Sequence, residues 1–305
     1  MKIVAAVVTY NRKALLHECI DALLAQDYSP FDILIIDNAS TDGTQESLTE
    51  YIAKGQISYV NTGANLGGAG GFQCAIRESV EQGYDAIWMM DDDTIPRSDA
   101  LGEMVAAANA VPPGWGFLSG KALWTDGSFC KMNEQKLLRG DLYRVYGIAP
   151  CREATFVSLF LSAETVREIG LPIKEFFIWG DDVEYTRRIS ARRPSYYVSQ
   201  SVVTHKTANN VGSNIAKDVP ERLPRYRYAY RNEVYIARHE DWKRRGYQSC
   251  KIIYHLIRVM LTAKSDRWQR MKTIVCASAE GLSFNPQIEF AEHAEQTTSR
   301  STGND

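Results

Sequence analysis

Short, mostly apolar runs alternate with amphipathic stretches along the first third of the chain. The expected strands cover residues 3–8, 32–37, 56–61 and 85–90. The expected helices, with apolar residues at helical spacing, cover residues 13–25, about 41–53 and 72–82. Strands buried on both faces have unbroken apolar runs, and their alternation with helices is typical of parallel sheets. This part of the chain therefore predicts an α/β fold with a mostly parallel sheet.

The rest of the chain is more mixed. Further strands are expected at residues 117–120, 156–162 and 195–204, and further helices at residues 164–169 and 181–192. From residue 225 to about 281 the pattern is helical, with breaks expected near Gly246 and Ser265. After Phe290 the chain is polar and aperiodic, which predicts disorder. These shifts divide the chain into an α/β domain over residues 1–220, a helical segment over residues 221–290 and a tail over residues 291–305.

Charge changes this picture in the helical segment. Between Glu221 and Lys272, 14 Lys and Arg residues stand against five Asp and Glu, although the net charge of the 305-residue chain is −2. Such an excess indicates either an anionic partner or a solvated helical face. No stretch reaches the roughly 18 apolar residues of a membrane span, but residues 252–261 would suit an amphipathic helix on a membrane surface.

The cysteines and the amino terminus both favour the cytoplasm. The six cysteines are scattered and include no CxxC pair, which argues against a zinc cluster or a disulfide framework. The apolar run at residues 3–8 is followed by Asn11, Arg12 and Lys13, so we expect a buried strand there rather than a signal peptide.

Polar clusters follow each of the first four expected strands. They cover residues 9–12, 37–42, 65–71 and 91–93. Ligands of parallel sheets bind at the carboxyl ends of the strands. The sequence therefore predicts one ligand site built from these four segments.

Three consecutive aspartates, Asp91, Asp92 and Asp93, end the fourth expected strand. Residues two apart in a strand face the same way, so Asp91 and Asp93 can converge on one cation. Mg²⁺ and Mn²⁺ prefer such carboxylate ligands and often share substrate phosphate oxygens. An acidic turn that caps a helix is the alternative. His205, at the end of a later strand, has the chemistry of a further metal ligand, although a structural role is also typical.

A glycine-rich segment, NTGANLGGAGGF, follows the third expected strand. Its glycines let the backbone approach an anion closely, and the helix behind them offers free N–H groups. The segment lacks the GxGxxG spacing of dinucleotide-binding domains and the lysine of a P-loop.

An acidic pair, Asp181 and Asp182, stands at the start of an expected helix. Helix capping would explain this pair. The neighbouring aromatic residues Phe176, Phe177 and Trp179 also suit a sugar site, in which an aromatic face stacks on sugar C–H groups and a carboxylate takes a hydroxyl proton.

Together these residues resemble family 2 glycosyltransferases, inverting enzymes that use nucleotide sugars and have the fold called GT-A. The matching segments occur in the family's order over about residues 1–206: VVTYNR, IIDNASTDGT, NLGGAGG, MDDDTIP, WGDDVEY and TH. The resemblance implies that the α/β domain is a GT-A nucleotide-sugar-binding domain and that the helical segment follows it.

The resemblance also implies a role for individual residues. The donor nucleotide is expected to contact Thr9, Asn11, Arg12, Asp37, Asn65, Gly67, Gly68 and Asp92, with Asp37 bonded to the uracil ring. Mn²⁺ or Mg²⁺ is expected on Asp91, Asp93 and His205. Asp182 is expected to be the general base with Asp181 as its partner, and Trp179 and Glu184 are expected to contact the acceptor.

Within the family the motifs are most similar to galactofuranosyltransferases, which use UDP-galactofuranose, and next to rhamnosyltransferases, which usually use dTDP-rhamnose. The chain differs from the large polymerising galactofuranosyltransferases in lacking an extra N-terminal domain and in carrying Gly180 between Trp179 and the acidic pair. We expect a metal-dependent transferase that adds galactofuranose, in a single linkage, to a growing surface glycan such as a cell-wall polysaccharide or O-antigen. Its acceptor would be lipid-linked, and the enzyme would work at the cytoplasmic face of the plasma membrane.

Two other classes of protein fit less well. A nucleotidyltransferase would need a glycine-rich loop at its amino terminus, and VVTYNRK contains no glycine. A non-catalytic module that binds carbohydrate or nucleic acid would suit the aromatic and basic run at residues 225–239. Such a module has no use for the aspartates and His205, so no nucleic-acid partner is expected.

Overall fold

A mixed β-sheet forms the centre of the structure, a computed structural model that describes residues 1–138 and 147–291. Its strands follow the order β3-β2-β1-β4-β9-β6-β10-β8-β7. The first four are β1 (Ile3–Thr9), β2 (Asp32–Asp37), β3 (Ser58–Asn61) and β4 (Ala86–Asp91). They pair in parallel, and every residue of β1 is buried. The predicted parallel arrangement is confirmed for these strands.

The second half of the sheet is mixed. It contains β6 (Phe117–Leu123), β7 (Lys136–Leu137), β8 (Ile148–Glu153), β9 (Leu159–Ser162) and β10 (Tyr196–His205). β9 runs antiparallel between β4 and β6, whereas β10 is parallel to β6 and antiparallel to β8. A short strand that the sequence pattern missed, β5 (Thr94–Pro96), pairs antiparallel with β10. The parallel pattern of β1–β4 therefore does not extend through this half.

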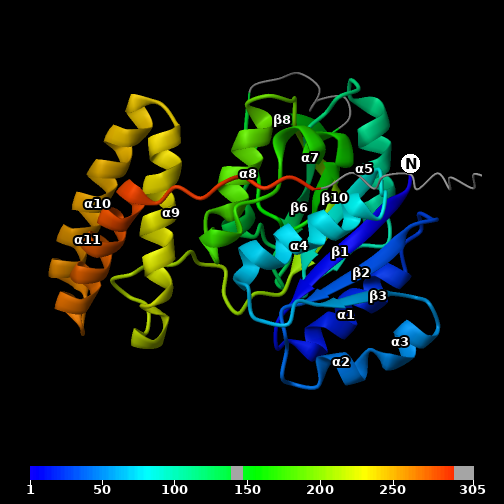
Figure 1. Cartoon of the computed structure of the whole chain (residues 1–305), viewed down its shortest axis with the longest axis horizontal. Coiled ribbons are helices and arrows are strands. Elements are labelled where there is room, and N and C mark those ends of the chain that lie inside the picture. Colours follow the sequence, from blue (N-terminus) through cyan, green and yellow to red (C-terminus); the bar gives the residue numbers. More distant parts are fainter. Residues whose placement is uncertain (139–146, 292–305) are drawn as a thin grey trace, which may run out of the picture.

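Helices cover both faces of the sheet and give the molecule three layers (Figure 1). One face packs against α1 (Lys13–Leu24) and α5 (Ala100–Ala110). The opposite face packs against α4 (Gly67–Glu81), α7 (Ala163–Ile169) and α8 (Asp181–Ser190). Alternate residues of β1 belong to the two cores: Val7 lies in the first and Val8 in the second. Burial on both faces explains the unbroken apolar runs.

Several short helices connect the larger elements. The stretch expected as one helix over residues 41–53 forms two, α2 (Thr44–Ser47) and α3 (Thr49–Ala53), after Gly43 in a left-handed conformation. Three single turns of 3-10 helix are η1 (Lys131–Asn133), η2 (Lys174–Phe176) and η3 (Pro220–Arg222).

The helical segment consists of α9 (Arg225–His239), α10 (Trp242–Thr262) and α11 (Arg267–Ser283), which lie side by side beyond α8 (Figure 1). The break expected near Gly246 is wrong, because Gly246 lies inside α10. The chain turns instead at Glu240 and Asp241, where an Asp241 carboxylate oxygen caps α10 by accepting a hydrogen bond from the Arg244 backbone N–H at 2.8 Å. The break expected near Ser265 is confirmed.

The chain after α11 returns to the α/β body. There the carboxylate of Glu289 forms ion pairs with Arg77 and Lys174, and its backbone carbonyl accepts a hydrogen bond from Leu171 at 2.8 Å. The expected disorder over the final residues concerns a stretch that, from residue 292 on, lies outside the described residues. Among the described residues, no helix is both long and apolar enough to cross a membrane.

Candidate active site

Strand pairing brings Asp93 and His205 together although 111 residues separate them in the sequence. Asp91 is the last residue of β4, and β5 begins three residues later. In the antiparallel pairing of β5 with β10, Thr94 lies opposite His205, the last residue of β10. The Lys206 backbone N–H also donates to the Asp93 carbonyl at 2.8 Å. The end of β10 is thus fixed beside the end of β4.

The side chains of Asp91, Asp93 and His205 converge. Their possible ligand atoms all lie within 4.8 Å of one another. Asp93 Oδ1 faces His205 Nε2 at 3.0 Å, and this buried oxygen accepts no hydrogen bond from any other group among the described residues. Two carboxylates and an imidazole in this arrangement form a donor set that suits Mn²⁺ or Mg²⁺.

Asn133, which sequence reasoning missed, sets the orientation of the His205 ring. Its side-chain oxygen lies 2.7 Å from His205 Nδ1, and its amide nitrogen donates to Thr155 Oγ1 at 2.9 Å. Because an amide oxygen only accepts, His205 Nδ1 must carry a hydrogen. If the ring loses its Nε2 proton, this nitrogen presents a lone pair toward Asp93 Oδ1, so a cation that replaces the proton would satisfy both atoms.

The charges at the end of β4 strongly perturb one another. Burial and the charge of Asp93 raise the pKa of Asp91 to about 7, and burial raises that of Asp92 to about 6. For His205, burial alone would lower the pKa, but the bond to Asp93 outweighs it and raises the pKa to about 10. Arg12 donates to Asp93 and lies 3.5 Å from Asp92. The cluster thus attracts positive charge.

Two predicted donor contacts shape the loops around this cluster. Thr9 Oγ1 donates to Asp92 at 2.8 Å, and Asp92 is only 4% exposed. The Asn11 side-chain oxygen accepts a hydrogen bond from the Thr41 backbone N–H at 2.7 Å, while the Asn11 N–H donates to Ser40 Oγ at 2.9 Å. Asn11 therefore ties the end of β1 to the loop after β2.

Asp37 is completely buried at the end of β2. Its carboxylate accepts hydrogen bonds from the Ser40 backbone N–H at 2.8 Å and from the Tyr59 hydroxyl at 2.7 Å. Burial and this bond raise the pKa of Tyr59 to about 12, so the hydroxyl stays protonated and donates. In this arrangement Asp37 holds the loop in shape, and a direct contact with a base would require the loop to open.

The glycine-rich segment forms the first turn of α4. The helix begins at Gly67, not at Phe72 as expected, and the side chain of Asn65 in the preceding turn accepts a hydrogen bond from the Gly67 N–H at 2.9 Å. Gly67 has a φ of 72°, and a Cβ built there would lie 2.1 Å from the Phe177 carbonyl oxygen. That oxygen also accepts a hydrogen bond from the Ala69 N–H at 3.1 Å. Gly67 is therefore required for packing, whereas a Cβ on Gly68 would meet no atom within 4 Å.

The loop that Gly67 touches leads into the acidic pair, and its backbone is strained. Phe177 and Trp179 have φ values of 62° and 66°, which residues other than glycine rarely adopt. Asn232, a fully buried residue of α9, donates from one nitrogen to the carbonyls of Phe176 at 3.0 Å and Trp179 at 2.8 Å. Helix α9 thus holds this loop. Sequence reasoning missed Asn232 because nothing in a helical pattern marks such a contact.

Asp181 and Asp182 stand in the first turn of α8. Burial and the charge of Asp182 raise the pKa of Asp181 to about 7. Burial raises the pKa of Asp182 to about 6, with further contributions from the charges of Glu153 and Asp91. The contribution of Asp91 to the pKa of Asp182 indicates that the acidic pair lies near enough to Asp91 for their charges to interact. A carboxylate of this pKa can accept a proton near neutral pH.

The two residues expected at the acceptor lie apart. Trp179 lines a cavity beside α9 and α10, where its ring packs against Tyr226 with centroids 5.2 Å apart. Glu184 lines a different cavity and forms a two-pronged ion pair with Arg188, at 2.8 and 3.0 Å. Both cavities border α9, but Trp179 and Glu184 do not line the same one.

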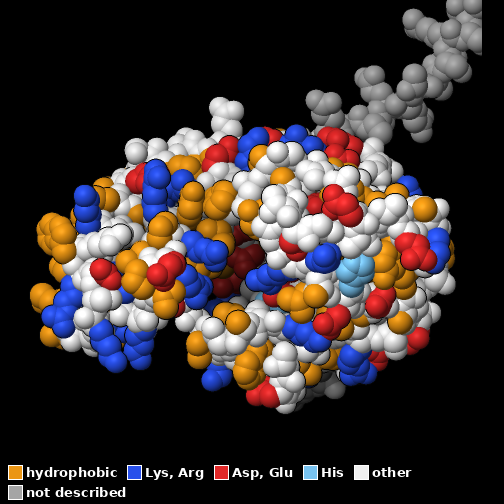
Figure 2. Space-filling view, turned by 90° about the horizontal axis from the view of Figure 1, so that it is seen from below, with side chains coloured by type: hydrophobic (Ala, Val, Ile, Leu, Met, Phe, Trp, Pro, Cys, Tyr) orange, Lys and Arg blue, Asp and Glu red, His pale blue; other side chains and the backbone are white. Residues whose placement is uncertain are grey.

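A hollow separates the α/β body from the helical segment (Figure 2). Acidic side chains lie recessed in it, and basic and apolar side chains surround it. Such a recess, with buried carboxylates of perturbed pKa, is typical of a site that binds and transforms a small ligand.

Comparisons with known proteins bear on the family and the fold. Residues 5–114 match the family described as Glycosyl transferase family 2. Galactofuranosyltransferase GlfT1 of Mycolicibacterium smegmatis is 25% identical over 300 residues, which cover 88% of this chain and 95% of that protein.

Solved structures share the fold at low identity. S. aureus TarS 1-349 in complex with UDP has a TM-score of 0.56 at 15% identity, over 93% of this chain and 72% of that one. In the longer TarS structure the match covers 44% of the relative. The mannosyltransferase PcManGT from Pyrobaculum calidifontis, in complex with GDP-Man and Mn²⁺, has a TM-score of 0.53 at 16% identity, over 93% and 76% of the two chains.

The contact between Gly67 and Phe177 predicts opposite results for two neighbouring glycines. We expect Gly67→Ala to destabilise the protein by about 1–3 kcal/mol, because the new methyl group meets backbone and the φ is unfavourable. Gly68→Ala should stay within about 0.5 kcal/mol of the wild type. Denaturant unfolding of the purified variants measures both, and equal stability of the two variants would contradict the close packing of α4 on the loop.

Proposed function

We propose that the chain, which belongs to glycosyltransferase family 2, transfers galactofuranose from UDP-galactofuranose to a hydroxyl group of a growing glycan, with inversion at the anomeric carbon. The observation that carries the proposal is the convergence of Asp91, Asp93 and His205. The charge of Asp91 also contributes to the raised pKa of Asp182, so the two groups interact. One end of the site can hold a charged diphosphate through a cation, and the other offers a single general base.

The choice of sugar rests on likeness. The relative named galactofuranosyltransferase is matched over 95% of its length, so the likeness extends through the helical segment as well as the sheet. A uridine nucleotide is supported by the shared fold with TarS, whose structure contains UDP. A divalent cation is supported by the shared fold with PcManGT, whose structure contains Mn²⁺.

On the donor side, we assign the nucleotide to the loops after β1 and β2. Thr9, Asn11 and Arg12 would border it, and Asp37 would shape the loop beside the base. Asn65, Gly67 and Gly68, with Asp92, would border the diphosphate. Asp91, Asp93 and His205 would hold Mn²⁺ or Mg²⁺, which when bound neutralises the charge that develops on the departing diphosphate.

On the acceptor side, Asp182 would take the proton from the attacking hydroxyl. Its raised pKa suits it to this role, because a carboxylate of ordinary pKa would be a weaker base and a poorer match to neutral pH. The neighbouring Asp181, with a pKa of about 7, would limit the negative charge beside it. The site offers one base and no second carboxylate assigned as a nucleophile, so a single displacement with inversion follows. Trp179 would border the acceptor sugar.

We also propose that the catalytic unit spans residues 1–220 and that residues 221–290 serve the acceptor at a membrane surface. Helix α10 contains five Lys or Arg residues and no Asp or Glu. Its exposed apolar side chains are Tyr247, Ile253, Tyr254, Ile257, Met260 and Leu261. Trp242 at its start and Trp268 in the first turn of α11 are 76% and 77% exposed. Basic helices with such apolar faces bind anionic bilayers, and Trp rings favour the headgroup level.

Sedimentation with lipid vesicles tests the membrane proposal. We expect the protein to bind anionic vesicles at low salt and to dissociate at high salt, since each Lys or Arg near the surface contributes about 1 kcal/mol that salt screens. Failure to bind anionic vesicles at low salt would remove this proposal.

A donor screen tests the proposed reaction. UDP-galactofuranose, UDP-galactopyranose, UDP-glucose and dTDP-rhamnose are each incubated with enzyme and Mn²⁺, and release of the nucleotide is measured. We expect the fastest release from UDP-galactofuranose. Faster release from dTDP-rhamnose would make the enzyme a rhamnosyltransferase instead, and no release from any donor would contradict the proposal.

Asp182→Asn separates the roles of the acidic pair. Transfer should fall by about 10²–10⁴-fold while donor binding stays nearly unchanged, because the amide cannot take the acceptor proton. Wild-type kcat/KM should fall as pH decreases through about 6, where Asp182 becomes protonated. The matched variant Asp181→Asn should lose less. If Asp182→Asn kept more than half of the activity and Asp181→Asn did not, the two roles would be reversed.

A further inference from the structure

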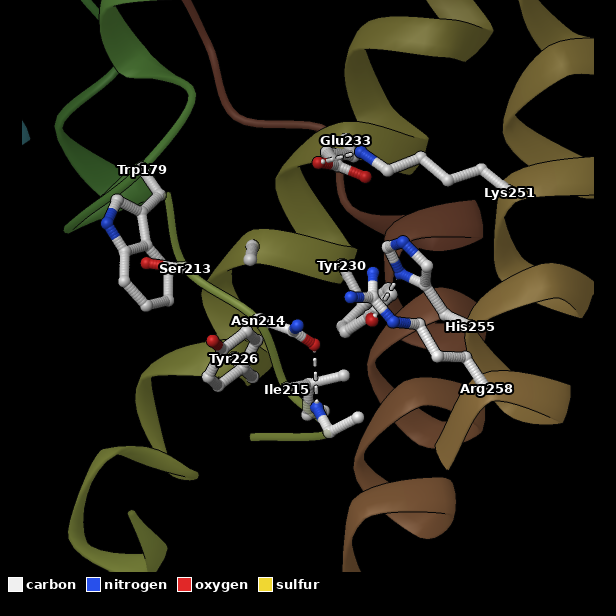
Figure 3. A pocket seen from close by; sticks show the side chains of 12 residues that line it. Trp179, Ser213, Asn214, Ile215, Tyr226, Tyr230, Glu233, Lys251, His255 and Arg258 are labelled. Atoms are coloured by element: carbon white, nitrogen blue, oxygen red, sulfur yellow. Dashed lines mark hydrogen bonds and ion pairs between the residues drawn. The ribbon is translucent and has the colours of Figure 1, made fainter. Parts of the chain in front are cut away.

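A cavity of about 210 Å³ lies between the helical segment and the loop of residues 177–180 before α8, called here the acceptor loop (Figure 3). Trp179 borders it on one side, and residues 213–216 border it from the connection that precedes α9. Helices α9 and α10 supply the rest of its lining. None of the three residues assigned to the metal lines this cavity. It is therefore a separate space that shares only the loop with the reaction centre.

Positive charge dominates one wall of the cavity. Lys251, His255 and Arg258 follow one another at helical spacing on α10, so they lie on the same side of the helix. Lys251 forms an ion pair with Glu233 at 2.6 Å. In contrast, the guanidinium of Arg258 has neither a carboxylate partner nor a hydrogen bond among the described residues. It points toward Tyr230 (Figure 3), and its central carbon lies 6.0 Å from the centroid of the Tyr254 ring.

The positive charges of this wall also affect the pKa of His255. The Tyr230 hydroxyl and His255 Nδ1 are 2.7 Å apart. Burial lowers the pKa of His255, and the charges of Lys251 and Arg258 lower it further. The ring is therefore neutral at physiological pH, and it can form hydrogen bonds to an anion without adding repulsion between cations. The wall as a whole keeps one positive charge that no side chain of the cavity balances.

An exposed apolar row runs beside the cationic row on the same helix. Tyr254, Ile257 and Leu261 are 57%, 48% and 70% exposed. At about 100° per residue, these positions lie next to Lys251 and Arg258 around the helix, on the side away from α9 and α11. A molecule with a charged head and an apolar tail could therefore contact both rows at once.

The size of the cavity limits what it can enclose. Pockets that enclose a whole organic ligand are typically about 300–1,000 Å³, and this one is smaller. It suits a charged head group, while the rest of the molecule stays outside. Trp179, which belongs to the acceptor loop, borders the cavity, so its ring would lie between such a head group and Asp182.

We propose that this cavity binds the phosphate or diphosphate head of an amphiphilic acceptor, whose apolar chain lies along the exposed row of α10 and whose sugar reaches past Trp179 to Asp182. The inference rests on the proposed transfer reaction and adds to it a second anion site, distinct from the one for the donor diphosphate. Arg258 is its principal ligand, with Lys251, His255 and Tyr230 around the anion.

A titration of the full chain with farnesyl diphosphate tests this site. The donor site is first saturated with UDP and Mn²⁺, and binding of the probe below its micelle concentration is measured by calorimetry. We expect Arg258→Gln to weaken binding at least tenfold, since a charge-assisted hydrogen bond is lost, and Arg258→Lys to restore most of it. Lys243→Gln removes an exposed charge of the same helix outside the cavity and should change binding less than twofold.

Two further probes separate the head group from the chain. Pyrophosphate, which lacks the chain, and farnesol, which lacks the charge, should each bind at least tenfold more weakly than farnesyl diphosphate. Equal binding of pyrophosphate would overturn the amphiphile assignment, and unchanged binding by Arg258→Gln would overturn the site. In a separate titration that starts without UDP, displacement of the bound probe by added UDP would also overturn it, because the probe would then occupy the donor site.

The probe titration involves no turnover, so it can fail independently of the proposed reaction. A donor screen without activity, together with probe binding that depends on Arg258, would remove the transfer reaction and keep the anion site. Active transfer from UDP-galactofuranose, together with probe binding that is indifferent to Arg258, would remove the site and keep the reaction.

Discussion

The carboxylates at the end of β4 repel one another, and the structure must place groups beside them that offset this repulsion. Two like charges about 4 Å apart repel by about 4 kcal/mol at the effective dielectric of a protein surface. Arg12 from the end of β1 and His205 from the end of β10 bring positive or polarisable groups to Asp93. The sheet order explains how, because β1 pairs directly with β4 and the short β5 pairs with β10. A divalent cation would complete this balance.

The helical segment contacts the candidate active site through the loop before α8. Asn232 of α9 holds the carbonyls of that loop, Gly67 of α4 packs against it, and Asp182 follows it directly. Strained backbone persists only where the surroundings fix it, and here two elements far apart in sequence do so. Any partner that shifts α9, including a membrane or a lipid-linked acceptor, would act on the position of Asp182, the proposed general base.

The sequence predicted the parts of the site that follow from local pattern. Apolar runs located β1 to β4, and the aspartates at the end of β4 were expected to meet His205. The rest depended on contacts that no local pattern carries. Asn133 and Asn232 are ordinary polar residues until the fold brings them to His205 and to the acceptor loop. The ion pair between Glu184 and Arg188 is likewise absent from the prediction, which assigned Glu184 only to the acceptor.

The central claim is that Asp91, Asp93 and His205 form one cation site for the donor diphosphate, and Mn²⁺-dependent binding of UDP tests it most directly. Calorimetric titration with UDP is compared in Mn²⁺ and in EDTA for the wild type, Asp93→Asn, His205→Ala and the exposed control Glu50→Gln. We predict that Mn²⁺ tightens UDP binding at least tenfold in the wild type and the control, and that both site variants lose this effect. UDP binding of equal strength in Mn²⁺ and EDTA, or site variants that keep the Mn²⁺ effect, would contradict the account.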